Sequence, residues 1–222
     1  MDHAPYKEYS RIPFQKTKAV KKQIAFFDFD GTLTTKDTLL EFIKFSTGRF
    51  RFYLGFLLNS PWLIAYKVKL IPNQLAKERI LTWFFRNKPL AAFQQDGEDF
   101  AASVIPSLLR PKGLREISLL LEKGVTVVIV SASPANWIEP WTRSIGASLI
   151  ATRLEATPVS PDKAPQLTGR IEGKNCHGPE KVRRIREEFP PEDFDTIYAY
   201  GDTSGDRPML ALATHAFMKP FR

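Results

Sequence analysis

The residues best suited to chemistry are two aspartates one residue apart, Asp28 and Asp30. They follow the apolar run of residues 23–27, so both carboxylates can reach the same space at the end of a buried strand while Phe29 points into the core. Two carboxylates this close repel each other, and a hard divalent cation relieves that repulsion. The pair therefore predicts a Mg²⁺ site, although a simple Asp-Gly turn explains an isolated motif of this kind nearly as well.

Polar side chains follow two later apolar segments in the same way. Residues 125–130 lead into Ser131, and residues 196–200 lead into Gly201 and Asp202, with Asp206 four positions further on. In an open α/β sheet, ligands bind beyond the carboxyl ends of the parallel strands. These side chains are therefore expected to meet the Asp28 and Asp30 carboxylates at one edge of the sheet.

The positions between these strands indicate the framework that holds them. Amphipathic stretches at 114–123 and 180–188 alternate with the strands, which predicts an α/β fold with a Rossmann-like, doubly wound parallel sheet. Weaker strand candidates lie at 149–154 and 215–218. Residues 38–109 are aromatic-rich and helix-like without a convincing strand, which indicates an inserted helical cap. The predicted core is then 23–37 and 110–222, preceded by a basic arm at 1–22.

Composition narrows the class of protein. The chain has 222 residues, of which 43% are hydrophobic and 25% charged, as expected for a folded globular protein. Its single cysteine, Cys176, can form neither an internal disulfide nor a cysteine-ligated zinc site, which favours a reducing cytoplasm. Residues 1–22 are polar and basic and contain no apolar core of a secretory signal.

Four ordered motifs carry a family resemblance. They are the run of residues 28–34, Ser131 after a hydrophobic strand, Lys181, and the run of residues 201–206. Together they resemble the motifs of the haloacid dehalogenase-like (HAD) hydrolases, over residues 23–218. The helical insertion after the first motif is similar to the C1-type cap of subfamily IB, the phosphoserine-phosphatase-like branch. Within that branch the motifs look most like those of generic phosphatases and phosphatidylglycerophosphatase C.

The resemblance implies a Mg²⁺-dependent phosphomonoester hydrolase. Asp28 would attack phosphorus to form an aspartyl-phosphate, and Asp30 would act as general acid and then base. The implied Mg²⁺ ligands are Asp28, Asp30 through its backbone carbonyl, Asp202 and Asp206, the last directly or through water. The implied phosphate-binding residues are Thr32, Ser131, Ala132 and Lys181.

Individual positions leave alternatives open. Ser131 alone could cap the next helix, and Lys181 alone could be a solvated charge, with Lys174 as the fallback for its role. His177 reads better as a loop residue than as a metal ligand, because an oxygen-rich site suits Mg²⁺. Asp37 is a candidate for substrate specificity. It stands where phosphoserine phosphatases usually have the longer glutamate, so recognition of serine is doubtful.

The charge of the cap raises further alternatives. Residues 44–88 carry nine Lys and Arg against one Glu, a field that attracts anions. With its aromatic stretches at 50–58 and 61–66, the cap could rest on an anionic membrane and admit a lipid phosphate, although these residues fit the cap's own core better. The substrate is thus expected to be a phosphorylated small molecule or lipid, acted on in the cytoplasm or at the inner face of the membrane. A phosphomutase is a rival, and nucleic-acid binding is not expected.

Overall fold

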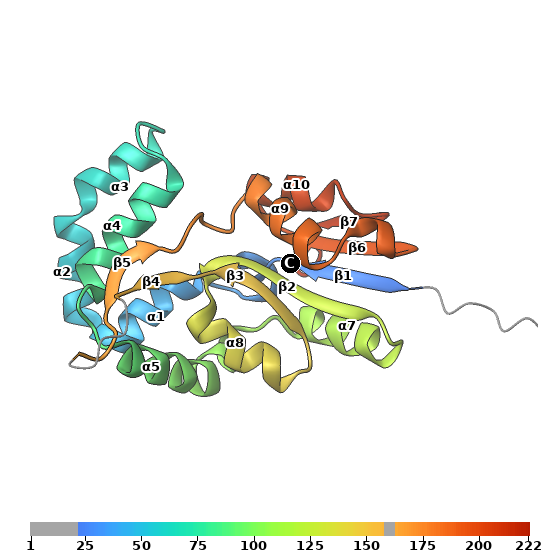
Figure 1. Ribbon diagram of the computed structural model, residues 1–222, viewed down its shortest axis with the longest axis horizontal. Coiled ribbons are helices and arrows are strands. Elements are labelled where there is room, and N and C mark those ends of the chain that lie inside the picture. The colour runs from blue at the N-terminus through green and yellow to red at the C-terminus, as the bar shows by residue number, and fades with distance from the viewer. Residues whose placement is uncertain (1–21, 158–162) are drawn as a thin grey trace, which may run out of the picture.

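A five-stranded parallel sheet forms the centre of the protein (Figure 1). The computed structural model describes residues 22–157 and 163–222, so the predicted basic arm lies, apart from Lys22, outside the described residues. The strand order is β3-β2-β1-β6-β7, and all four neighbouring pairs are parallel. The strands are β1 (Gln23–Phe27), β2 (Thr126–Pro134), β3 (Ser148–Thr152), β6 (Thr196–Gly201) and β7 (His215–Met218).

Helices cover both faces of this sheet, which explains why its central strands are continuously apolar. On one face, Phe27 and Ile129 share a core cluster with Ile117 of α7 (Pro111–Glu122) and Trp137 of α8 (Ala135–Ser144). On the other face, a second cluster joins the sheet to α9 (Pro179–Glu188) and α10 (Arg207–Leu210). Figure 1 shows the two helix pairs on opposite sides of the sheet. The predicted doubly wound α/β fold is confirmed, and both weaker strand candidates belong to its sheet.

The segment between the first two strands is mostly helical. It contains α1 (Thr38–Thr47), α2 (Arg49–Leu58), α3 (Ser60–Lys67), α4 (Asn73–Phe85), α5 (Leu90–Ser103) and α6 (Ile105–Leu108). Aromatic side chains pack it onto the main core: Phe42 contacts Phe85, Phe93 and Phe100 within the segment and Trp137 of α8. No helix among the described residues is long and apolar enough to cross a membrane.

A two-stranded antiparallel sheet lies against this helical segment instead of joining the main sheet. It consists of β4 (Leu154–Ala156) and β5 (Leu167–Ile171). Glu78 of α4 accepts a hydrogen bond from the backbone N–H of Ile171 at 3.1 Å, and Thr82 donates to the carbonyl of Gly169 at 3.2 Å. We therefore propose that this hairpin belongs with the cap, although the sequence-based division places 110–222 in the core.

Gly169 is expected to be essential for this packing. It has φ +84°, and a Cβ there would lie 2.4 Å from Cα of Thr82. Gly169→Ala should therefore combine left-handed strain of about 1 kcal/mol with overpacking of about 2 kcal/mol, measurable as lost free energy of unfolding in urea. Gly173→Ala is the matched control, because Gly173 has φ +72° and nothing within 4 Å of its Cβ position. Equal losses for the two variants would contradict the close-packing account.

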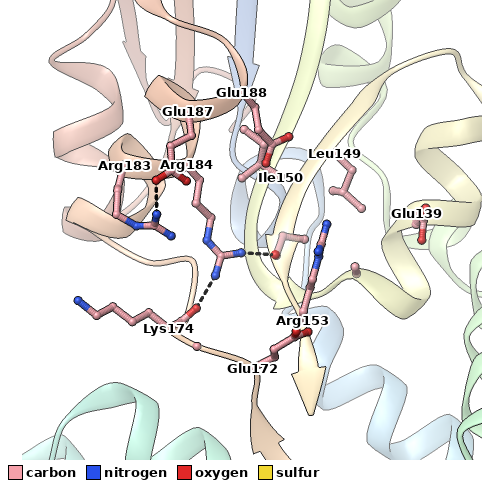
Figure 2. Close-up of a pocket in the computed structure, with 13 residues that line it drawn as sticks. Glu139, Leu149, Ile150, Arg153, Glu172, Lys174, Arg183, Arg184, Glu187 and Glu188 are labelled. Atoms are coloured by element: carbon pink, nitrogen blue, oxygen red, sulfur yellow. Dashed lines mark hydrogen bonds and ion pairs between the residues drawn. The ribbon is translucent and has the colours of Figure 1, made fainter. Parts of the chain in front are cut away.

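The side chain of Arg184 fastens α9 to the sheet. The guanidinium of Arg184 donates to the carbonyls of Ala151 and Lys174, at 2.7 and 2.6 Å, and to the carboxylate of Glu180 at 2.9 Å. Figure 2 shows Arg184 reaching across a surface pocket to these two carbonyls. Glu180 is buried and also bonds Arg183, and these bonds, against the opposing effect of burial, lower its pKa to about 2.

The Glu180 carboxylate should make the stability of the protein pH-dependent. Because its pKa is lower in the folded than in the unfolded chain, its stabilisation is present above its ordinary pKa and is lost as the pH falls towards 2. Wild type is therefore expected to melt at a higher temperature than Glu180→Gln at pH 6, with the difference shrinking below about pH 4.5. A difference independent of pH would contradict this role.

Candidate active site

The position of Asp28 follows directly from its place at the end of β1. Its backbone N–H continues the β1–β6 pairing by donating to the carbonyl of Tyr200 at 2.9 Å. The side chain is buried, and both carboxylate oxygens are engaged: Oδ2 accepts from Thr32 at 2.8 Å and Oδ1 from Lys181 at 2.6 Å. Burial raises the pKa of Asp28 to about 7, against the opposing charge of Lys181. This carboxylate is therefore buried and held in one orientation.

Lys181, from the first turn of α9, is a fully buried cation. Its Nζ donates to Oδ1 of Asp28 at 2.6 Å, to Oδ1 of Asp206 at 2.7 Å and to the carbonyl of Val130 at 2.8 Å. Burial disfavours its charge, but the two carboxylates hold the pKa of Lys181 above the ordinary lysine value. Lys181 is thus no solvated surface charge, and it bridges the ends of three strands.

Three carboxylates converge beside it. Asp28, Asp202 and Asp206 each offer an oxygen within 4.8 Å of the other two, and all three side chains are buried. Oδ1 of Asp202 is buried and has no hydrogen-bond partner among the residues that the structure describes, which is costly unless a cation binds there. An all-oxygen set with an unpartnered carboxylate oxygen fits Mg²⁺. The Asp30 carboxylate is not in this group.

Two local features hold the acidic residues that follow β6 in place. Asp206 closes a capping box, because its Oδ2 accepts from the backbone N–H and hydroxyl of Thr203 at 3.0 and 2.9 Å. Gly31 has φ +82° and lies so close to Asp202 that a Cβ would be 2.5 Å from its Oδ2. The glycine of the first motif therefore makes room for a carboxylate of the last.

Asp30 faces the same space from a different environment. Its Oδ1 accepts from the backbone N–H and the hydroxyl of Thr38, both at 2.6 Å. Oδ2 is left with one long contact, 3.4 Å from Oγ of Ser131, which itself accepts from the N–H of Ser133. With Oδ1 saturated by donors, Oδ2 is the atom able to carry a proton.

A cavity of about 380 Å³ opens between this site and the cap. Its floor includes Asp28, Asp30, Lys181 and Asp206. Much of the opposite wall is apolar and comes from four cap helices: Leu39, Leu40, Phe56, Leu63, Tyr66, Ala76 and Ile80. A ligand whose polar group binds at the floor would therefore have its other atoms packed against apolar side chains and the phenol of Tyr66.

The remaining predicted positions are placed as follows. Asp37 lines the cavity, but its carboxylate also caps α1 by accepting from the N–H of Leu40 at 3.2 Å. Ala132 lines the cavity beside Ser133, and Thr32 reaches the site through Asp28. Lys174, the fallback for Lys181, lies instead along the surface pocket of Figure 2.

Two residues in the cavity wall were given no role in the site by sequence reasoning. Lys77 reaches down from α4, and its Nζ donates to the carbonyl of Ala132 at 2.9 Å. Burial lowers its pKa, although Asp30 and Asp37 act to raise it. His177 lines the cavity too, and a Cβ on Gly205 would lie 2.3 Å from its Nε2, which explains the glycine there. Nothing in the spacing of Lys77 distinguishes it from the other cations of the cap.

Arg222 was also missed. Its guanidinium donates to Oδ2 of Asp202 at 2.6 Å, placing a positive charge beside the carboxylate cluster. Since like charges repel, Arg222→Gln is expected to tighten Mg²⁺ binding by about tenfold in calorimetric titrations. Arg186→Gln, on the exposed side of α9, serves as the control and should change nothing. If Arg222→Gln binds Mg²⁺ more weakly than wild type, then Arg222 orients Asp202 for the ion and does not compete with the ion for this carboxylate.

Comparison with known proteins shows the family of the chain. Residues 25–211 match the family model of the haloacid dehalogenase-like hydrolases. The protein is 40% identical over 197 residues to Protein CicA of Caulobacter vibrioides, covering 88% of this chain and 85% of that protein. The chain belongs to the haloacid dehalogenase-like hydrolase family. The predicted resemblance is confirmed, and so is the prediction of an enzyme of this class.

Solved structures share the fold at low sequence identity. A Bordetella pertussis protein of unknown function superposes with a TM-score of 0.71 at 23% identity, over 88% of each chain. A phosphoserine phosphatase carrying an analogue of its phospho-aspartyl intermediate superposes with a TM-score of 0.61 at 16% identity, over 91% of this chain and 95% of the other. The shared architecture includes the helical segment as well as the sheet.

Proposed function

We propose that the protein is a Mg²⁺-dependent phosphomonoester hydrolase that works through an aspartyl-phosphate on Asp28. The observation that carries this proposal is the buried group of Asp28, Asp202 and Asp206, in which one carboxylate oxygen has no partner. Its position at the floor of a cavity supports a catalytic role over a purely structural one. The phosphoserine phosphatase of similar fold supports the same type of reaction.

The first step is nucleophilic displacement. An oxygen of Asp28 forms a bond to phosphorus, and the bond from phosphorus to the ester oxygen breaks. The departing alkoxide takes the proton from Oδ2 of Asp30, the oxygen not already saturated by Thr38. The products are an alcohol and a phosphoryl group on Asp28.

The second step returns the enzyme to its starting state. Asp30, now a carboxylate, takes a proton from water as the water oxygen attacks phosphorus, and the bond to Asp28 breaks. Inorganic phosphate leaves, and Asp30 is protonated again. Lys181 would neutralise the phosphoryl oxygens and Ser131 would orient them, with Thr32 and the backbone at Ala132 as further donors.

Asp28, Asp202, Asp206 and the carbonyl of Asp30 would hold Mg²⁺. When bound, Mg²⁺ supplies charge stabilisation to the transferring phosphoryl group. Without it, Asp28 would meet an anionic ester with only Lys181 in contact to offset their repulsion. The predicted Mg²⁺ dependence follows from this imbalance of charge.

A phosphate-release screen tests the proposal. Purified protein should release inorganic phosphate from p-nitrophenyl phosphate and from members of a phosphomonoester panel with Mg²⁺, and lose that activity in EDTA. Release that persists unchanged in EDTA, or no release from any ester, would contradict it. Dependence on a bisphosphorylated activator with little net release would favour the rival phosphomutase.

The apolar cavity wall favours a second candidate, a lipid-phosphate phosphatase at a membrane surface. A small polar substrate would lose hydration on binding beside the apolar side chains of Phe56, Leu63 and Ile80. An acyl or prenyl chain could instead pack against them. A short-chain phosphatidic acid should then give a higher kcat/KM than glycerol phosphate, which has the same phosphoester link without acyl chains. A preference for the glycerol phosphate would exclude this candidate.

A further inference from the structure

The outer side of α2 exposes an apolar stripe. Its members recur at the spacing that places them along one side of a helix, and they are between 39% and 83% exposed: Phe50, Tyr53, Leu54, Leu57 and Leu58. Such a stripe normally faces a protein core. The core-facing side of α2 is a different one, formed by Phe52 and by Gly55, where a Cβ would lie 2.4 Å from Phe84. The helix is thus apolar on two sides, and the described part of the chain covers only one of them.

The next helix extends this surface. Ile64 of α3 is 62% exposed, and Val68 and Leu70 follow it at 58% and 77%. We call these three side chains and the α2 stripe the cap tip. Figure 1 shows α2 and α3 at the end of the molecule opposite β6 and β7, so the rest of the described fold does not cover them. Exposed apolar surface gathered in this way marks an interaction site.

The charges around the cap tip have one sign. Arg49 and Arg51 lie in the first turn of α2, Lys67 ends α3 and Lys69 follows it, and all four are exposed. Among the described residues, none of the four forms an ion pair with an acidic side chain. The sole acidic residue between positions 44 and 88, Glu78, is turned towards β5 and accepts from Ile171. The partner must therefore offer hydrocarbon together with negative charge.

The same two helices form part of the catalytic cavity. Phe56 of α2 and Leu63 and Tyr66 of α3 line it, while their neighbours along each helix belong to the cap tip. The surface that meets the partner and the wall that meets the substrate are therefore opposite sides of one thin layer. A ligand with an apolar tail would have a short path between them.

We propose that the cap tip docks on an anionic lipid bilayer, with α2 lying in the plane of the interface. Its apolar stripe enters the boundary between headgroups and acyl chains, and the four cations sit among the lipid phosphates. A second copy of the chain fits less well, because it would bring the same cations together. Nucleic acid offers the charge but leaves the aliphatic stripe in water. Delivery of a lipid phosphoester to Asp28 rests on the proposed function, whereas docking itself needs no catalysis.

Vesicle sedimentation of the full chain tests the docking. Wild type is expected to sediment with vesicles of phosphatidylcholine and phosphatidylserine at low salt, and not with phosphatidylcholine alone. Arg49→Gln/Lys67→Gln should weaken binding roughly 20-fold, because each basic residue near an anionic leaflet contributes about fivefold. Phe50→Ser/Leu57→Ser should weaken it by about tenfold or more through loss of apolar burial. None of these four side chains lines the cavity.

Matched controls separate docking from folding and from catalysis. Leu119→Ser/Lys112→Gln removes an exposed leucine and a lysine from α7, on the core, and should bind vesicles like wild type. Asp28→Asn should also bind like wild type, and the cap-tip variants should hydrolyse p-nitrophenyl phosphate normally, so failure of docking and failure of the proposed chemistry give different results. Equal binding by wild type and both cap-tip variants, or no binding to anionic vesicles, would overturn the proposal. So would a dimer in light scattering that Phe50→Ser/Leu57→Ser converts to monomer without any vesicle binding.

Discussion

Replacing Asp28 with Asn is expected to abolish phosphate release, lowering kcat by roughly 10⁴-fold or more. The amide is nearly the shape of the carboxylate and can still accept from Thr32, so the site should keep its form. It cannot act as the nucleophile. Steady-state assays with p-nitrophenyl phosphate measure the loss, and mass spectrometry of acid-quenched wild type should find a phosphoryl group on the peptide that contains Asp28.

Asp99→Asn is the matched control for this substitution. Asp99 lies exposed on α5, where its carboxylate bonds only Gln95 among the described residues, and its change to Asn should leave kcat untouched. Circular dichroism of both variants would confirm that neither has unfolded. Undiminished activity in Asp28→Asn, or a phosphoryl group on a different residue, would remove Asp28 from the mechanism.

Replacing Lys181 with Met should destabilise the metal-free protein by about 3–5 kcal/mol in urea unfolding, as expected for breaking a buried ion pair. The side chain is only 1% exposed and contacts both Asp28 and Asp206, so its removal leaves two buried carboxylates without their cation. Part of this loss should be recovered on adding Mg²⁺, because the ion supplies positive charge to the same carboxylates.

The response to Mg²⁺ distinguishes this explanation from simple loss of packing. Lys174→Met, at a neighbouring but exposed lysine, is expected to change the free energy of unfolding by less than about 0.5 kcal/mol. Phosphate release by Lys181→Met should stay low even at saturating Mg²⁺, since the phosphoryl oxygens lose a donor. A Lys181→Met protein as stable as wild type without Mg²⁺ would contradict the buried-cation role.

The central sheet could be predicted because its signal is local. A strand buried on both faces needs an unbroken apolar run, and residues 23–27, 125–130 and 196–200 each supply one before a polar turn. The position of Asp28, Ser131 and Asp202 at one edge follows from parallel pairing alone. The cap hairpin β4–β5 could not be predicted in this way, because its short strands are defined by packing against α4.

The sequence alone determined the order of the motifs, the α/β class and the identity of the acidic residues, because each depends on residue type and spacing along the chain. Tertiary structure decided which cations accompany them. Lys77 and Arg222 reach the site from segments far from it in sequence, and the local pattern around each is that of an ordinary surface charge. It also decided that the apolar stripe of α2 stays uncovered, since burial depends on what packs against a helix and not on the helix itself.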